Sequence, residues 1–170
     1  MKNFRRLLPL LCGALALFAA GCNSTGGFND QSELPAGVKR VEARFFLEVA
    51  GDPMGAAPMP ISGTRVPINP NPVFHELDIA AVGLERDSIQ GARLIFQFNG
   101  EAARELYRMT TTNQGRRLVL MLNRQTVGAY PITAPVSNGR LVVYPELDEK
   151  LLPDLAAGIN YYSAELARQR

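Results

Sequence analysis

The chain has 170 residues, of which 46% are hydrophobic and 20% charged. This length and composition are typical of one ordinary globular domain and exclude a disordered or collagen-like chain. The formal net charge of +2 falls to −1 if Lys2, Arg5 and Arg6 are removed with a targeting segment, so we expect no nucleic-acid partner. One His and two Cys are too few for a multi-histidine zinc site, a disulfide scaffold or an iron–sulfur cluster. We therefore predict no metal and no cofactor.

The first 21 residues are predicted to be a secretory signal. A positively charged start precedes the apolar run Leu7–Phe18, which is shorter than the roughly 20 residues that a membrane-spanning helix needs. The following Ala19-Ala20-Gly21-Cys22 resembles a bacterial lipobox, which implies cleavage between Gly21 and Cys22 and lipidation of the Cys22 sulfur. In that family Asn23 implies transfer to the outer membrane. The alternative is an ordinary signal peptide followed by an incidental free thiol at Cys22.

Residues 22–37 are polar and show no apolar periodicity, so we predict a flexible tether that carries a folded domain over residues 38–170. The first predicted element of that domain is a strand at Val41–Val49. Its apolar residues alternate with polar ones, which is typical of a strand buried on one face, and only Phe46 breaks the alternation.

A stretch rich in Gly, Pro, Ala and Met follows at Gly51–Gly63, and we predict a mobile hairpin loop there. The thioethers of Met54 and Met59 are soft ligands that copper(I) accepts. Because no His or Cys accompanies them, we interpret the loop without a metal. A short strand at Arg65–Ile68 is expected next.

Two further strands are predicted at Glu76–Leu84 and Ala92–Phe98. Asn99 is then expected to cap a helix whose apolar residues recur at helical spacing to about Thr112. The almost entirely apolar segment Arg117–Leu122 predicts a central strand, with Leu120 buried in the core beside Leu106 and Met109.

A turn at Asn123–Thr126 leads into predicted strands at Val127–Tyr130 and Leu141–Tyr144. The residues Leu151, Leu155, Ile159, Tyr162 and Leu166 predict a closing helix, in which Pro153 is tolerated only near the start. Strands grouped with two helices, without βαβ alternation, indicate an α+β fold, that is, a mainly antiparallel sheet with two helices packed on it.

Candidate chemistry is sparse. His75-Glu76-Leu77-Asp78 lacks the second histidine of the H-E-x-x-H zinc motif, and we interpret His75 as a surface residue beside a strand. Arg116, Arg117 and Arg124 could bind phosphate or lipid headgroups, but we interpret them as solvated turn charges. No nucleophile motif, Walker loop or dinucleotide fingerprint is present, so we do not expect an enzyme.

The middle of the chain resembles a known family. The resemblance rests on Phe96–Ala103 continuing to Leu106, on Thr112–Leu122, on Val127–Ile132, and on Gly139. These stretches are similar in order and spacing to SecD, a protein-export subunit, in the head of its first periplasmic domain. The chain departs from the family at Arg116, where SecD has Lys, and at Ala129-Tyr130, where it has Ser-Ala. The resemblance implies the fold and polypeptide contact, and no catalytic residues.

We therefore predict a membrane-anchored, non-enzymatic lipoprotein of the cell envelope, at the outer membrane facing the periplasm. Its domain would contact extended or unfolded polypeptides or envelope proteins during export or assembly. The candidate contacts are apolar loop residues and a proline-marked sheet edge: Met54, Met59, Ile61, Tyr130 and Pro131. The alternative is a lipoprotein of the same fold that binds a small ligand or an envelope component.

Overall fold

The computed structural model describes residues 38–51, 56–88 and 91–169, which belong to one compact unit. The predicted α+β fold is confirmed, and every strand pair among these residues is antiparallel. The strands are β1 (Ala43–Leu47), β2 (Ala56–Pro58), β3 (Arg65–Pro67), β4 (Ile79–Asp87), β5 (Gly91–Phe98), β6 (Arg117–Leu122), β7 (Gln125–Pro131) and β8 (Arg140–Val143). The α-helices are α1 (Gly100–Thr112) and α2 (Leu152–Arg168), and short 3₁₀ turns lie at Glu76–Asp78 and Glu149–Leu151.

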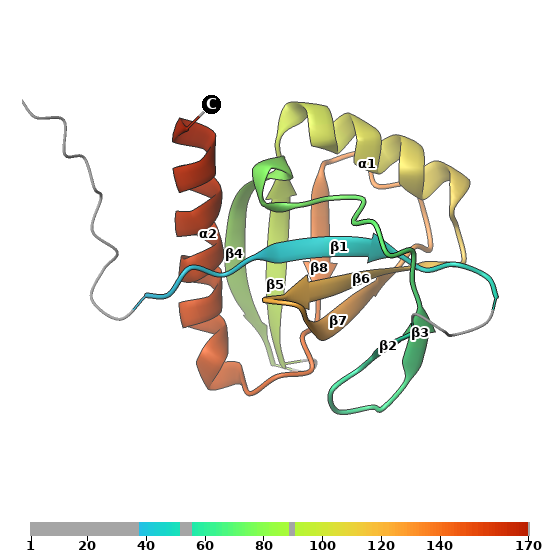
Figure 1. Ribbon diagram of the computed structural model, residues 1–170, viewed down its shortest axis with the longest axis horizontal. Coiled ribbons are helices and arrows are strands. Elements are labelled where there is room, and N and C mark those ends of the chain that lie inside the picture. The colour runs from blue at the N-terminus through green and yellow to red at the C-terminus, as the bar shows by residue number, and fades with distance from the viewer. Residues whose placement is uncertain (1–37, 52–55, 89–90, 170) are drawn as a thin grey trace, which may run out of the picture. The chain divides into compact units, whose positions relative to one another are not determined.

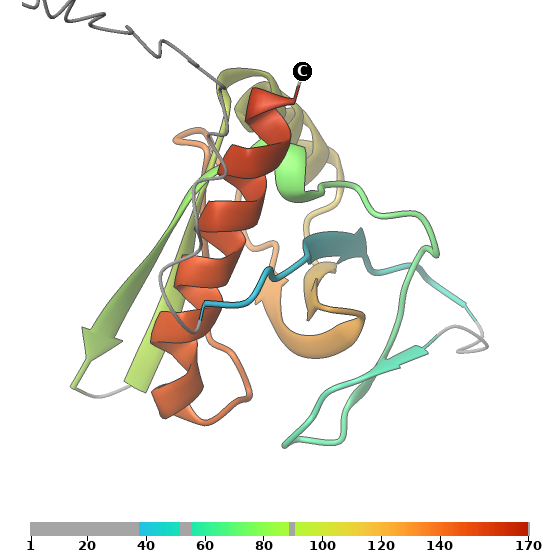
Figure 2. The ribbon, with the colours of Figure 1, turned by 60° about the vertical axis from the view of Figure 1, so that its left-hand side comes forward.

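The strands form two three-stranded sheets and a separate hairpin, where the sequence predicted one sheet. The sheet orders are β1-β6-β7 and β4-β5-β8, and β2 pairs only with β3 (Figures 1 and 2). The main core joins the two larger sheets. Phe45 of β1 meets Phe96 of β5 edge-on, with ring centroids 5.0 Å apart. Burial of these large apolar side chains is the main favourable contribution to folding.

Helix α1 begins where the sequence predicted. The Asn99 side chain accepts a hydrogen bond of 2.9 Å from the Ala102 N–H, which satisfies one of the free donors of the first turn. The buried face of α1 includes Leu106 and Met109, which share the main core with the fully buried Leu120. The predicted burial of Leu120 is therefore confirmed.

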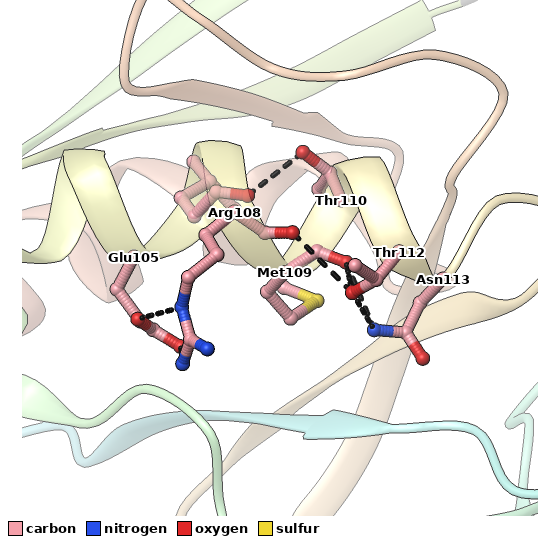
Figure 3. A network of polar contacts seen from close by, with 7 residues as sticks. Glu105, Arg108, Met109, Thr110, Thr112 and Asn113 are labelled. Carbon is pink, nitrogen blue, oxygen red and sulfur yellow. Dashed lines mark hydrogen bonds and ion pairs between the residues drawn. The ribbon is translucent and has the colours of Figure 1, made fainter.

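Threonine hydroxyls satisfy carbonyl groups near the C-terminus of α1 (Figure 3). Thr110 Oγ1 donates to the Leu106 carbonyl at 2.7 Å, and Thr112 Oγ1 donates to the Met109 carbonyl at 3.2 Å. Thr110 Oγ1 also accepts from the Val136 N–H at 2.9 Å, so it ties the chain after β7 to the helix. On the exposed side, Arg108 forms an ion pair of 2.7 Å with Glu105.

Helix α2 covers the outer strand β4 (Figure 1). The Asn160 amide accepts from the Val82 N–H at 2.6 Å and donates to the Val82 carbonyl at 2.8 Å, and so occupies the place of a neighbouring strand. The buried face of α2 is formed by Leu152, Ala156, Gly158, Ile159 and Ser163. Of the residues that predicted this face, Ile159 is fully buried and Leu155 packs against the main core. Leu151 is 52% exposed, because it lies in the 3₁₀ turn before the helix. Pro153 lies in the first turn, as predicted.

Two other boundaries differ from the prediction. Residues 76–78 form a 3₁₀ turn before β4, because the Asp78 carboxylate accepts from the His75 N–H at 2.9 Å and the Asp78 N–H donates to the His75 carbonyl. The turn between β6 and β7 is shorter than predicted, since Leu122 pairs with Gln125. Neither helix of the described residues combines the length and apolarity that crossing a bilayer requires.

Candidate functional site

Strand β6 carries apolar side chains on both faces. Leu118, Leu120 and Leu122 point into the main core. Val119 lies on the other face, in a smaller core that also contains Met59 of the hairpin. Successive strand residues point to opposite faces, so a fully apolar strand needs a cover on each side. The β2–β3 hairpin covers one part of the second face.

A single carboxylate holds the tip of this hairpin. Glu146 accepts three hydrogen bonds of 2.8 Å each, from the Ile61 N–H, the Ser62 N–H and the Ser62 hydroxyl. Burial of the Glu146 carboxyl acts to raise its pKa, but these hydrogen bonds outweigh it and lower the pKa below the ordinary value of 4.5. The Glu146 N–H also donates to the Val127 carbonyl at 2.6 Å, which links the hairpin tip to β7.

Two hollows lie on the second face of the β1-β6-β7 sheet. The larger, about 570 Å³, is lined by Ala56, Ala57, Pro58, Pro60, Ile68, Met121, Arg124, Gln125, Thr126 and Leu147. The smaller, about 60 Å³, is lined by Glu42, Arg44, Phe46, Met121 and Arg124. Met121 and Arg124 line both hollows, which therefore adjoin at these two side chains. We call the two together the hairpin groove; its walls are mostly apolar and it is the candidate site.

The charges around the hairpin groove are largely paired. Arg44 lies 3.5 Å from the Glu42 carboxylate, and its Nε donates to Glu76 Oε1 at 3.1 Å. Arg124 makes no ion pair or side-chain hydrogen bond with the residues that the structure describes. A bound segment that covers the groove would remove water from these charges. Because Arg44 keeps its carboxylate partners, that loss of water costs less than it would for an isolated charge. The groove therefore fits an apolar segment.

The predicted peptide contacts do not form one site. Met59 is only 7% exposed and belongs to the small core, so it is not accessible as the predicted peptide contact. The hairpin packs Met59 against Val119 of β6. Ile61 is 75% exposed at the hairpin tip. Met54 lies outside the described residues.

Tyr130 and Pro131 close the outer strand β7, which among the described strands pairs only with β6. Tyr130 pairs across the sheet with Leu118, and its ring packs against the main core. Burial raises the pKa of the Tyr130 phenol. Cross-strand partners share a face, so Tyr130 lies on the opposite face of the sheet from Met59.

The residues considered for metal binding and for phosphate or lipid headgroups do not come together either. His75 Nδ1 lies 3.3 Å from Asp78 Oδ2, and no group of three metal-ligating side chains is found among the described residues. Arg117 makes a bidentate pair with Glu48, at 3.0 and 2.7 Å, and this hydrogen bonding lowers the pKa of Glu48. Arg117 begins β6 and Arg124 lies in the turn after its end. The two are therefore too far apart to form the phosphate or lipid-headgroup cluster that was the less favoured interpretation.

The predicted processing site, Gly21 and Cys22, lies outside the described residues, as does the predicted tether. Cleavage and lipidation therefore stay predictions.

The sequence analysis did not predict the hairpin groove, although the sequence contains an indication of a second apolar face. Phe46 breaks the alternation of the first strand, and the structure places its side chain in the groove wall. Together with the two-sided apolar strand β6, Phe46 indicated a second apolar face. Arg124, Ile68 and Leu147 converge on that face only in the tertiary structure.

The fold resembles solved structures of SecDF. One is described as "a membrane component SecDF that enhances protein export"; it superposes with a TM-score of 0.58 at 15% identity, over 72% of this chain and 63% of that chain. The second, SecDF "in Super-membrane-facing form", gives a TM-score of 0.58 at 16% identity, over 72% of this chain and 19% of that chain. No protein-family model and no curated protein matches the sequence. The resemblance to SecD is thus confirmed at the level of the fold.

Proposed function

We propose that the domain binds extended polypeptide segments at the cell envelope without catalysis, while a lipidated Cys22 holds it at the outer membrane, facing the periplasm. The observation that carries this proposal is the hairpin groove, an apolar channel beside a sheet whose other face is filled by the main core. Met121 gives the lining a flexible side chain that suits apolar groups of varied shape, and Phe46 and Pro58 extend the apolar surface.

The similarity of the fold to SecDF supports a role in protein export. SecDF is described as enhancing protein export, and this chain spans 63% and 19% of the two SecDF chains that it matches. A shared fold does not by itself assign a function. The proposal takes from SecDF only the general task of polypeptide contact, which would be passive here.

The test is a titration of the purified full chain, in detergent, against a fluorescently labelled unfolded protein. We expect saturable binding with a Kd on the order of micromolar. Met121→Gln, which keeps the length of the side chain but makes it polar, should weaken binding by about threefold to tenfold, since it removes part of the apolar contact.

Tyr107→Gln is the matched control. Tyr107 is an exposed apolar residue, 49% exposed on α1, and lines a different hollow. No saturable binding by the natural chain, or equal weakening by the two variants at unchanged thermal stability, would overturn the proposal. Deletion of the hairpin is a poor test, because it would expose Val119 of the small core.

A further inference from the structure

The turn between β6 and β7 has an unusual residue at its second position. Leu122 pairs with Gln125, so Asn123 and Arg124 form a two-residue turn, and both have positive φ, 47° and 67°. This is the geometry of a type I′ turn, where Asn is common first and Gly second. Arginine rarely adopts this left-handed conformation, because its Cβ crowds the backbone.

The turn is held firmly against the neighbouring strand. Asn123 Oδ1 accepts from the Glu42 N–H at 2.9 Å, and the Asn123 N–H donates to the Glu42 carbonyl at 3.0 Å. The backbone of Arg124 is therefore fixed in place. Its side chain is exposed and makes no ion pair or hydrogen bond to the described part of the chain.

Arg124 lies where the two parts of the hairpin groove meet, beside Met121. The remaining cation of the lining, Arg44, is paired with Glu42 and Glu76. Arg124 is thus the lining cation that forms no ion pair with a described residue, whereas Arg44 has two carboxylate partners. Strained backbone conformations concentrate at binding sites, and arginine matches a carboxylate through two parallel hydrogen bonds.

We propose that Arg124 is a specificity-determining residue that binds a carboxylate of the polypeptide in the groove. This inference rests on the proposed function and adds the chemistry of the preferred segment. That segment is extended, with an acidic group next to an apolar side chain that packs on Met121. The carboxylate is the side chain of an Asp or Glu residue, because Arg124 lies where the two parts of the groove meet and therefore faces the middle of a bound segment. The C-terminal carboxylate of the bound chain is the alternative that the experiment tests.

The experiment measures binding of three labelled apolar peptides to the purified full chain in detergent. The first contains a Glu and an amidated C-terminus, the second has Gln in place of Glu, and the third has Gln and a free C-terminal carboxylate. We expect the natural chain to bind the Glu peptide about fivefold to tenfold more tightly than either of the other two peptides. Raising the salt concentration should reduce that preference.

Arg124→Gly separates function from folding. Glycine suits the second turn position, so the thermal stability of the variant should equal or exceed that of the natural chain. The variant should bind the Glu peptide no more tightly than the neutral peptide. Arg104→Ala, which removes an exposed arginine of α1 outside this groove, should keep the preference.

The alternative results are distinguishable. If the natural chain binds all three peptides equally, or prefers the peptide with the free C-terminal carboxylate, the inference is overturned and the proposed function stands. The same holds if Arg124→Gly weakens the binding of all three equally. If the natural chain binds none of them, nor the unfolded protein, both are overturned.

Discussion

Glu146 connects two parts of the chain that are far apart in sequence. Its two carboxylate oxygens accept three hydrogen bonds from Ile61 and Ser62. These bonds hold the tip of the hairpin, which covers Val119. A glutamine has one oxygen in place of two, and its amide nitrogen cannot accept a hydrogen bond. The isosteric change therefore removes the negative charge and the acceptor of the Ser62 hydroxyl, whereas the amide oxygen can keep the two backbone donors that share Oε2.

We predict that Glu146→Gln lowers the free energy of unfolding by about 1 kcal/mol at neutral pH, the usual size for hydrogen bonds near the surface. Amide hydrogen exchange should accelerate in β2 and β3 and stay unchanged in β5, because only the hairpin is released. Denaturant unfolding with exchange measurements checks both. Acceleration throughout the molecule would contradict a local role for Glu146.

The same variant has a pH signature. The folded pKa of Glu146 is lowered below 4.5, so its contribution to stability is present above about pH 4.5 and is lost as the pH falls through the folded pKa. The difference in unfolding free energy between the natural chain and Glu146→Gln should therefore shrink in acid. A difference that stays constant from neutral pH to about pH 3 would show that the charge is not involved.

At the scale of elements, two helical glycines have opposite surroundings. A Cβ at Gly158 of α2 would meet the Lys39 carbonyl oxygen and lie 2.6 Å from Val41 Cγ2, because the segment that leads into β1 crosses the helix there (Figure 1). A Cβ at Gly100, the first residue of α1, would have no atom within 4 Å. Gly158 thus permits a close approach between α2 and the chain before β1.

We predict that Gly158→Ala destabilises the protein by about 1–3 kcal/mol, as overpacking does, although alanine is the better helix former. Gly100→Ala should be neutral or stabilising by up to about 1 kcal/mol, since it reduces only the freedom of the unfolded chain. Thermal and urea denaturation of the two variants checks the pair. Equal effects would mean that helix propensity, and not the crossing, controls position 158.

At the scale of the whole molecule, the prediction concerns the anchor. Cys22→Ala should leave an uncleaved precursor, because lipidation of the sulfur precedes cleavage in lipoprotein processing. Cys12→Ala, which changes the other cysteine of the sequence within the apolar run, should be processed normally. Gel mobility and detergent partitioning of both variants in a bacterial host give the answer. Normal cleavage and partitioning of Cys22→Ala would contradict the lipoprotein prediction.

Local patterns were sufficient for several elements. The alternation of Ala92, Leu94, Phe96 and Phe98 predicted β5, and these four side chains are buried in the structure. Asn99 predicted the start of α1. These signals are local, because a strand alternates every two residues and a helix cap acts within one turn. The resemblance to SecD also came from such ordered local patterns.

The tertiary structure decided the features that depend on residues distant in sequence. Two sheets formed where one was expected, since the pairing of β1 with β6 and of β5 with β8 joins segments far apart along the chain. Met59 became buried because β3 and Val119 lie against it, although its own neighbours in sequence are typical of a loop. The hairpin groove combines residues from Glu42 to Leu147, and no local period records such a convergence. The sequence by itself thus determined the α+β class, the helix start and the apolar strands, which depend on near neighbours. The partition into sheets and the site depend on long-range packing, which periodicity does not encode.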